Sequence, residues 1–174
     1  MKKSIVATML FIFLFHLNIL HGQEISNVGA LGVGVQATSL NYGISGRYNL
    51  TEVHGVQAII GSANYGLGGS VNAFTFSGRY LYSFPGENSN LRPYGFGQLG
   101  FWTVKFNDSF FGSNFNESST SLAYGFGGGV EYAFTGLEKL GFNIEAGYGG
   151  GSFSGGFSYS GVFFGGGVHY YFDL

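Results

Sequence analysis

The sequence predicts an all-β fold, an eight-stranded antiparallel up-and-down transmembrane β-barrel. Composition is the first indication, because only 9% of the 174 residues are charged, 19% are aromatic, and 33 glycines accompany 2 prolines. A soluble domain usually has about 25% charged residues. Several segments alternate large apolar and polar residues over about ten positions, which is typical of a membrane-barrel strand and argues against a disordered chain.

An export signal precedes the predicted barrel. Two lysines follow Met1, and an apolar run extends from Ile5 to Leu20. This run is interrupted by polar residues, whereas a spanning helix needs about 20 apolar residues, so we expect a cleaved signal peptide over residues 1–22 and the barrel domain over residues 23–174. The chain has no cysteine, which excludes disulfides and thiol chemistry. Export implies the bacterial envelope or secretion, and together with the predicted barrel it leads us to expect the outer membrane of a Gram-negative bacterium.

Charge disfavours several kinds of partner. Loss of the signal peptide reduces the basic residues from seven to five against nine acidic ones, so the formal net charge becomes −4. Nucleic-acid binding needs clustered Lys and Arg, and the remaining five are scattered, so we expect no nucleic acid. The mature chain's two histidines, His54 and His169, lack carboxylates at ligand spacing, so we expect neither metal nor cofactor.

The first four strands are predicted over residues 28–37, 40–48, 54–62 and 74–84. In the first, second and fourth, one parity is apolar or aromatic and the other is small or polar, as expected between lipid and a barrel interior. The segment 54–62 alternates poorly, so its phase stays open. The expected lipid-facing residues are Leu31, Val33, Val35, Leu40, Tyr42, Ile44, Tyr48, Phe74, Phe76, Tyr80, Tyr82 and Phe84.

The last four strands are predicted over residues 94–106, 122–134, 142–148 and 162–172. In the first of these, Gln98 and Lys105 have opposite parities, so either a β-bulge shifts the phase or Lys105 lies beyond the hydrocarbon. The other three alternate clearly, although the inner face of the last is less polar. Their expected lipid-facing residues are Tyr124, Phe126, Val130, Tyr132, Phe134, Ile144, Ala146, Val162, Phe164, Val168, Tyr170 and Phe172.

The connections are predicted to alternate between periplasmic turns and extracellular loops. The turns fall at 49–53, 85–91 and 135–139, and the loops at 38–39, 63–70, 107–120 and 149–156. The loop at 107–120 contains Phe110, Phe111 and Phe115, which are candidate surface-loop contacts. An interfacial aromatic girdle is the alternative explanation for these side chains.

The charged residues of the clearly phased strands all have the inward parity. They are Arg47, Arg79, Glu131 and Glu145. A lipid-facing Arg at mid-bilayer would cost roughly 2–4 kcal/mol, and buried charges must be paired, so we expect an Arg–Glu network inside the barrel. A polar plug is favoured over an ion-conducting gate, because eight strands leave an interior that side chains fill.

Four motifs resemble a known family. They are Arg92-Pro93-Tyr94, the stretch Gly127 to Tyr132, Glu145-Ala146-Gly147-Tyr148, and the stretch Gly167 to Phe172. Together they resemble the OmpA/OmpX-like small outer-membrane barrels, the porin-like outer membrane protein β-barrel domain. The resemblance implies eight strands, outer-membrane lipid as the surroundings, and insertion by the barrel-assembly machinery through a terminal strand that ends in an aromatic residue.

Three classes of function remain open. The sequence favours a structural or surface-interaction barrel whose surface ligand, if any, is unknown; the alternatives are a narrow porin-like channel and a soluble secreted lipocalin-like barrel that binds an apolar ligand. The lipocalin-like alternative predicts aromatics inside and charges outside. No enzyme is expected, because no serine of the predicted loops has a histidine near it in sequence and no catalytic constellation is visible.

Overall fold

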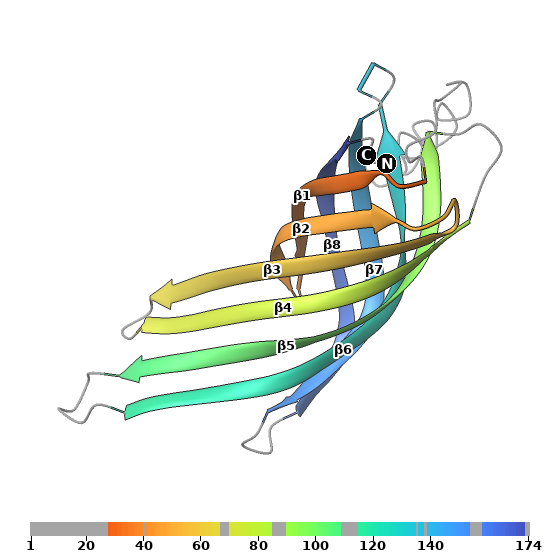
Figure 1. Ribbon diagram of the computed structural model, residues 1–174. Helices are drawn as coiled ribbons and strands as arrows, with labels where there is room; N and C mark the ends of the chain where they lie inside the picture. The colour runs from red at the N-terminus through yellow and green to blue at the C-terminus, as the bar shows by residue number, and fades with distance from the viewer. Residues whose placement is uncertain are drawn as a thin grey trace, which may run out of the picture.

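The computed structural model shows a closed barrel of eight antiparallel strands in sequential order, which confirms the predicted fold class (Figure 1). It describes residues 28–39, 41–66, 70–84, 90–108, 115–134, 136–137, 139–153 and 158–172, with backbone only at 63–66, 70–72, 106–108, 115–118, 153 and 159. The strands are β1 Leu31–Thr38, β2 Tyr42–Asn49, β3 His54–Gly66, β4 Ser70–Ser83, β5 Leu91–Asp108, β6 Phe115–Ala133, β7 Leu140–Phe153 and β8 Ser158–Phe172. β8 pairs with β1, which closes the barrel. The described residues include no helix long and apolar enough to cross a membrane.

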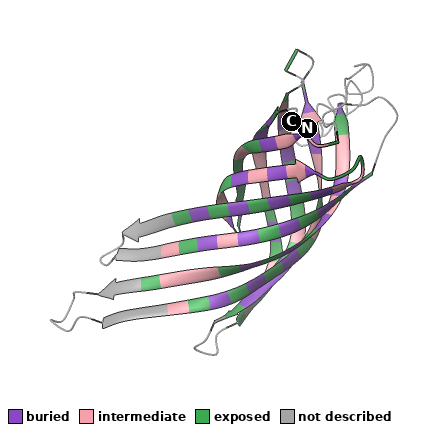
Figure 2. Ribbon diagram, viewed as in Figure 1, coloured by how far each residue is buried: buried purple, intermediate pink, exposed green. Residues whose placement is uncertain are grey.

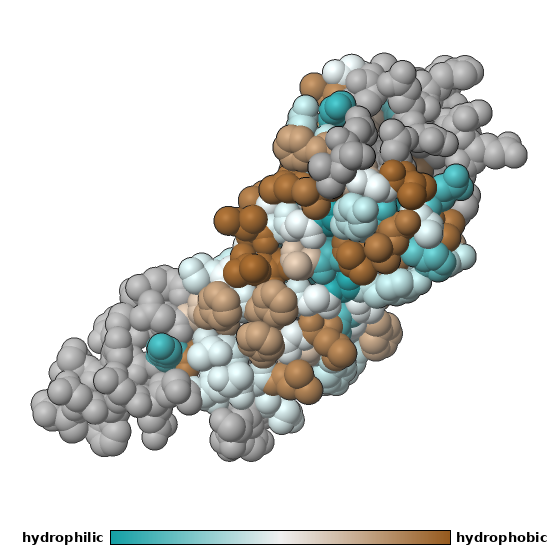
Figure 3. All heavy atoms as spheres, viewed as in Figure 1, coloured by the Kyte–Doolittle hydropathy of each residue, from teal (hydrophilic) through white to brown (hydrophobic). Residues whose placement is uncertain are grey.

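Burial alternates along the strands as the sequence pattern predicts (Figure 2). The outward positions hold large apolar side chains, for example Ile44, Leu99 and Phe164, with exposed fractions of 69%, 64% and 68%. Apolar side chains cover much of the face seen in Figure 3. Such a surface is unfavourable in water and suits a hydrocarbon environment.

The strand registers determine the tilt of the strands. Following paired residues from Phe172 of β8 to Leu31 of β1 and onward round the barrel leads back to β8 at Val162, ten residues from the start. With ordinary strand spacing and rise, this offset gives a tilt of about 42°, a backbone radius of about 8 Å, and an axial rise of about 2.5 Å per residue. A barrel this narrow has an interior that side chains fill.

The registers also settle the phase of the two strands that alternate poorly. In β3, Gln57 and Ile59 are buried, and in β5, Tyr94, Phe96 and Gln98 are buried. These strands carry apolar or aromatic side chains on the inward face as well as on the outward one. Periodicity is therefore weak in the sequence although the strands are regular.

Lys105 lies beyond the apolar band, and no bulge shifts the phase of β5. The registers of β5 with β4 and with β6 run without interruption along the paired residues. Lys105 is exposed and on the outward parity, fourteen residues from Leu91 at the other end of the strand. That separation corresponds to about 35 Å along the axis, whereas the apolar band of such barrels is about 25 Å tall.

Three segments predicted as extracellular loops are largely strand. β3 and β4 pair up to Gly66 and Ser70, β5 and β6 pair up to Asp108 and Phe115, and β7 continues to Phe153. The prediction of loops at 63–70, 107–120 and 149–156 was therefore wrong in extent. Glycine, serine and asparagine dominate these segments and are typical of loops, whereas here they continue strands that leave the apolar band.

An aromatic girdle surrounds the end of the barrel that holds the described chain ends. Ring pairs lie within 5.3 Å between centroids, among them Tyr82 with Phe84 and Tyr170 with Phe172. Aromatic side chains of this kind prefer the interface between headgroups and hydrocarbon. We call the strand ends nearest the described chain ends the lower ends, although Figure 1 draws them at the top. The girdle places these lower ends at one level.

Candidate functional site: the interior charge network

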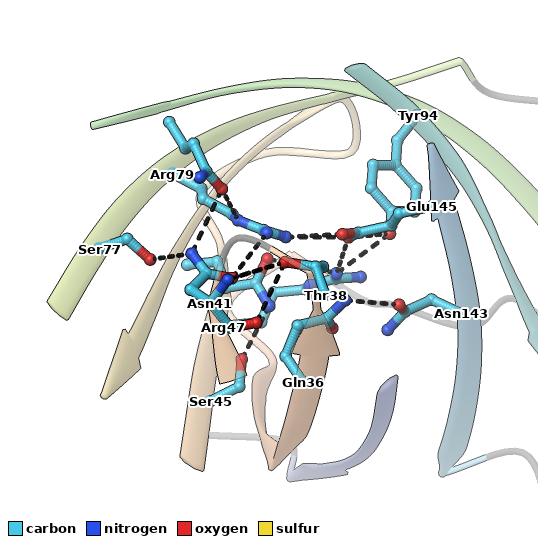
Figure 4. A network of polar contacts seen from close by, with 12 residues as sticks. Gln36, Thr38, Asn41, Ser45, Arg47, Ser77, Arg79, Tyr94, Asn143 and Glu145 are labelled. Carbon is cyan, nitrogen blue, oxygen red and sulfur yellow. Dashed lines mark hydrogen bonds and ion pairs between the residues drawn. The ribbon is translucent and has the colours of Figure 1, made fainter. Parts of the chain in front are cut away.

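The four charged residues predicted to face inward lie together inside the barrel (Figure 4 shows three of them). Arg47 lies on β2 and Arg79 on β4, while Glu131 lies on β6 and Glu145 on β7. Their exposed fractions are only 1% to 4%. The first strands thus contribute a positive wall and the later strands a negative wall, which meet only because the barrel closes.

Arg79 and Glu145 form a short ion pair at the centre of the network. Arg79 Nη1 donates to both carboxylate oxygens of Glu145, at 3.0 and 2.8 Å. Arg79 Nε donates to Gln98 Oε1 at 2.8 Å, and Nη2 donates to Asn41 Oδ1 at 3.3 Å. The guanidinium also lies over the Phe96 ring, 4.7 Å from its centroid, where the negative face of the ring favours a cation.

Arg47 and Glu131 form the second pair, nearer the chain ends. Arg47 Nη1 lies 3.1 Å from Glu131 Oε1. The hydroxyl of Tyr171 donates to the same oxygen at 2.6 Å. A buried carboxylate is thereby satisfied by one cation and one neutral donor, which is the condition under which a buried charge is tolerated.

Tyr94 connects the two ion pairs. Its hydroxyl donates to Glu145 Oε1 at 2.6 Å and accepts from Arg47 Nη2 at 3.5 Å. Arg47 Nη2 also lies 4.0 Å from Glu145 Oε1, and the Arg47 guanidinium lies 5.0 Å from the Tyr94 ring centroid. Glu145 therefore faces both arginines, although its short contacts are with Arg79 and Tyr94.

Neutral polar side chains complete the shell around the charges. Asn41 Nδ2 donates to Ser77 Oγ at 2.7 Å while its Oδ1 accepts from Arg79, so Asn41 links β2 with β4. Gln57 donates to Ser45 Oγ at 2.7 Å. Above this layer the interior becomes apolar, because Phe163 is 1% exposed and its ring lies 6.0 Å from that of Phe96.

No protein-family model matches the sequence, and no curated protein matches it. Among solved structures, the N-terminal β-barrel domain of Pseudomonas aeruginosa OprF aligns with a TM-score of 0.55 and 21% identity, covering 84% of this chain and 100% of that one. Neisserial surface protein A (NspA) aligns with a TM-score of 0.50 and 18% identity, covering 82% and 94%. The chain has the fold of the small eight-stranded outer-membrane barrels.

In this outer-membrane-type barrel, a Ser–His–Asn arrangement lies inside the wall. His169 Nε2 is 2.9 Å from Ser45 Oγ, and His169 Nδ1 is 3.3 Å from Asn143 Nδ2. Gln36 donates to Asn143 Oδ1, so the Asn143 amide donates to Nδ1 and the ring proton lies on Nε2. His169 then donates to Ser45 and cannot act as its base. The exposed fractions of His169 and Ser45 are 0%, so the arrangement is buried in the barrel interior.

The sequence could not identify every member of the network. Tyr94, Gln98 and Gln57 lie on the two strands whose phase it left open, so their inward orientation was not predicted. A usable signal existed in the register, because Arg79 pairs directly with Gln98 across β4 and β5, and with Gln57 across β3 and β4. Fixing the phase of β4 therefore fixes that of its neighbours.

The candidate loop contacts are only partly within the structure. Phe110 and Phe111 lie outside the described residues, and Phe115 begins β6 without a described side chain. The predicted signal peptide, residues 1–22, also lies outside the described residues. Within the described part of the chain, no group of three or more His, Asp or Glu residues could hold a metal ion.

Proposed function

We propose that this protein is an outer-membrane barrel of a Gram-negative bacterium with a structural or surface-interaction role, a plugged interior and no enzymatic activity. The observation that carries the proposal is that charged side chains lie inside the barrel and large apolar side chains lie outside it. Among the described strand side chains, Lys105 is the one charged residue on the outward parity, and it lies above the apolar band. A soluble lipocalin-like barrel would have the opposite arrangement.

The interior supports a plug. Both carboxylates accept short hydrogen bonds, both guanidiniums are paired, and aromatic rings cover the pairs. An interior with a backbone radius of about 8 Å is filled by such a layer, which leaves no continuous aqueous path. The network then serves to hold the walls of the barrel together.

The surface role is assigned to the strands that rise above the apolar band. β5 and β6 have 18 and 19 residues, against 8 each in β1 and β2, and they project beyond the short strands in Figure 1. Residues 109–114, which connect β5 to β6 in the sequence, lie outside the described residues. Replacing 109–114 by a two-residue turn is expected to leave the barrel folded and to abolish any binding to host or neighbouring cell surfaces. Unchanged binding would remove this segment from the proposal.

Cell fractionation tests the location. The full chain, expressed with residues 1–22, is expected in the outer-membrane fraction, inserted by the barrel-assembly machinery, with faster gel migration before boiling than after. Recovery as a soluble periplasmic or secreted protein would overturn the proposal.

A narrow channel is the second candidate, because Glu145 faces Arg47 as well as Arg79. Movement of the carboxylate from Arg79 to Arg47 would open a path beside Arg79. Planar-bilayer recording decides between the two: a plug gives no steps in the native protein, whereas a gate gives rare openings that Glu145→Leu makes frequent.

A further inference from the structure

The barrel is closed, but among the described residues the strands on one side of its wall end lower than the others. Strand pairing between β2 and β3 ends at Ile44 with Ile60, and pairing between β1 and β8 ends at Thr38 with Gly165. Past these residues, Ser39 N still donates to Phe164 O, and the Tyr42 carbonyl still lies against Gly61. Beyond those contacts the described strands pair β3 with β4 alone and β8 with β7 alone. We call this break in the hydrogen-bonded wall, between β3 beyond Gly61 and β8 before Phe164, the wall gap.

The floor of the wall gap is the turn that joins β1 to β2, where Ser39 is exposed and Thr38 and Asn41 are buried, while Leu40, expected to face lipid, lies outside the described residues. Thr38 N donates to Asn41 O at 2.7 Å, and Ser39 N donates to Phe164 O at 3.2 Å. The eight residues of β1 rise about 18 Å along the axis, whereas the apolar band of such barrels is about 25 Å tall. The floor therefore lies about 7 Å below the level to which hydrocarbon reaches on the other sides.

The taller sides show that the apolar band does reach that level. Phe101 on β5 and Leu122 on β6 are 43% and 65% exposed, ten and eleven residues from the lower ends of their strands. On β8, Val162 is 66% exposed at ten residues from Phe172 and borders the gap. If hydrocarbon had the same thickness all round, the bare edges of β3 and β8 would lie in it. Unsatisfied backbone groups there cost several kcal/mol each.

Lipid headgroups and water can form hydrogen bonds with these backbone groups, whereas hydrocarbon cannot. We propose that outer-leaflet headgroups, with their water, descend onto the turn between β1 and β2, so that the membrane is locally thinned on this side of the barrel. The inference rests on the proposed membrane location. Behind the gap, Phe163 is buried and its ring lies 6.0 Å from that of Phe96. The partner of this surface is the polar part of the lipid.

Single-cysteine variants test the proposal cleanly, because the chain has no cysteine of its own. Val162→Cys and Phe164→Cys border the gap, ten and eight residues from Phe172. Phe101→Cys and Leu99→Cys are matched controls on the tall side, ten and eight residues from Leu91. All four native side chains face outward and are 43% to 68% exposed.

Each variant is reconstituted into phosphatidylcholine vesicles, checked for heat-modifiable migration, and treated with a negatively charged methanethiosulfonate. The cysteine thiolate attacks the thiosulfonate sulfur of the reagent, which forms a mixed disulfide and releases methanesulfinate. Because the thiolate forms in water and not in hydrocarbon, the gap variants are expected to react at least about tenfold faster than their controls. Ser39→Cys, on the exposed turn, gives the aqueous rate, and Ile144→Cys, deep in the apolar band, gives the protected rate.

Two results would overturn the inference in different ways. Gap variants as slow as Phe101→Cys and Leu99→Cys would mean that hydrocarbon covers the gap. All positions, including Ile144→Cys, reacting at the aqueous rate would mean that the barrel does not lie in the bilayer, which refutes the proposed location itself.

Discussion

Removing one partner of the Arg79–Glu145 pair should destabilise the barrel far more than removing both. In Glu145→Leu, the Arg79 guanidinium, whose side chain is 0% exposed, loses its carboxylate at 2.8 Å. Two opposite charges about 4 Å apart at an effective dielectric constant near 20 attract by about 4 kcal/mol. An unpaired buried charge costs about 3–5 kcal/mol, so we expect a loss of that size in unfolding free energy.

Removing the other partner, Arg79, should reduce the unfolding free energy by less. In Arg79→Met the carboxylate keeps the Tyr94 hydroxyl at 2.6 Å and has Arg47 at 4.0 Å. The double variant removes both charges, and buried pairs replaced by apolar residues are often tolerated, so the double-mutant cycle should give a coupling of at least about 2 kcal/mol.

Urea unfolding in detergent micelles measures the cycle, with the chain's single tryptophan, Trp102, as the fluorescence probe and heat-modifiable migration as the check of closure. Lys105→Met is the control, because it removes an exposed charge outside the barrel and should leave the unfolding free energy unchanged. Additive losses in the two single variants, with a coupling below about 0.5 kcal/mol, would refute the view that the charges compensate each other.

Further expectations concern packing and neutral hydrogen bonds. Gly147→Ala would place a Cβ 2.4 Å from a backbone oxygen and 2.6 Å from the Phe163 ring, so overpacking should lower the unfolding free energy by about 1–3 kcal/mol. In the control Gly97→Ala, the new Cβ meets nothing within 4 Å, so the unfolding free energy should hardly change. Equal urea midpoints for the two variants would contradict this expectation. Tyr94→Phe removes the donor at 2.6 Å from Glu145 and should cost about 1–3 kcal/mol in unfolding free energy, with the aromatic packing kept; an unchanged midpoint would show that this hydrogen bond adds nothing.

The fold follows from sequence because most strands separate two environments. Where the inward face is polar, as around Arg47, Arg79 and Glu145, alternation is visible and the phase is predictable. Where the inward face carries Phe96 or Ile59, both faces are apolar and the signal disappears. Strand ends were predicted poorly for a related reason, since beyond the apolar band no lipid imposes a pattern on the outward face.

The charge network is also predictable only in part, because the sequence shows which residues face inward but not which of them pair. Parity alone brings four charges inside, because any other placement puts a charge on the apolar outer face. Parity cannot assign partners, since these depend on which strands face each other across the interior and on the ten-residue offset of the closed barrel. The pairing of Arg79 with Glu145, and of Arg47 with Glu131, is therefore a property of closure that no local segment contains.

The same dependence suggests what the network does for folding. A one-residue slip of β7 would turn Glu145 from the interior into lipid, because successive strand residues face opposite sides. A two-residue slip keeps Glu145 inside but moves it about 7 Å along the strand, beyond the 2.8 Å contact with Arg79. Glycine-rich strands such as β6 and β7 specify register weakly through packing, since neighbouring pairs such as Gly127 with Gly147 bury little side chain. We infer that the charges favour the register that these glycines specify weakly.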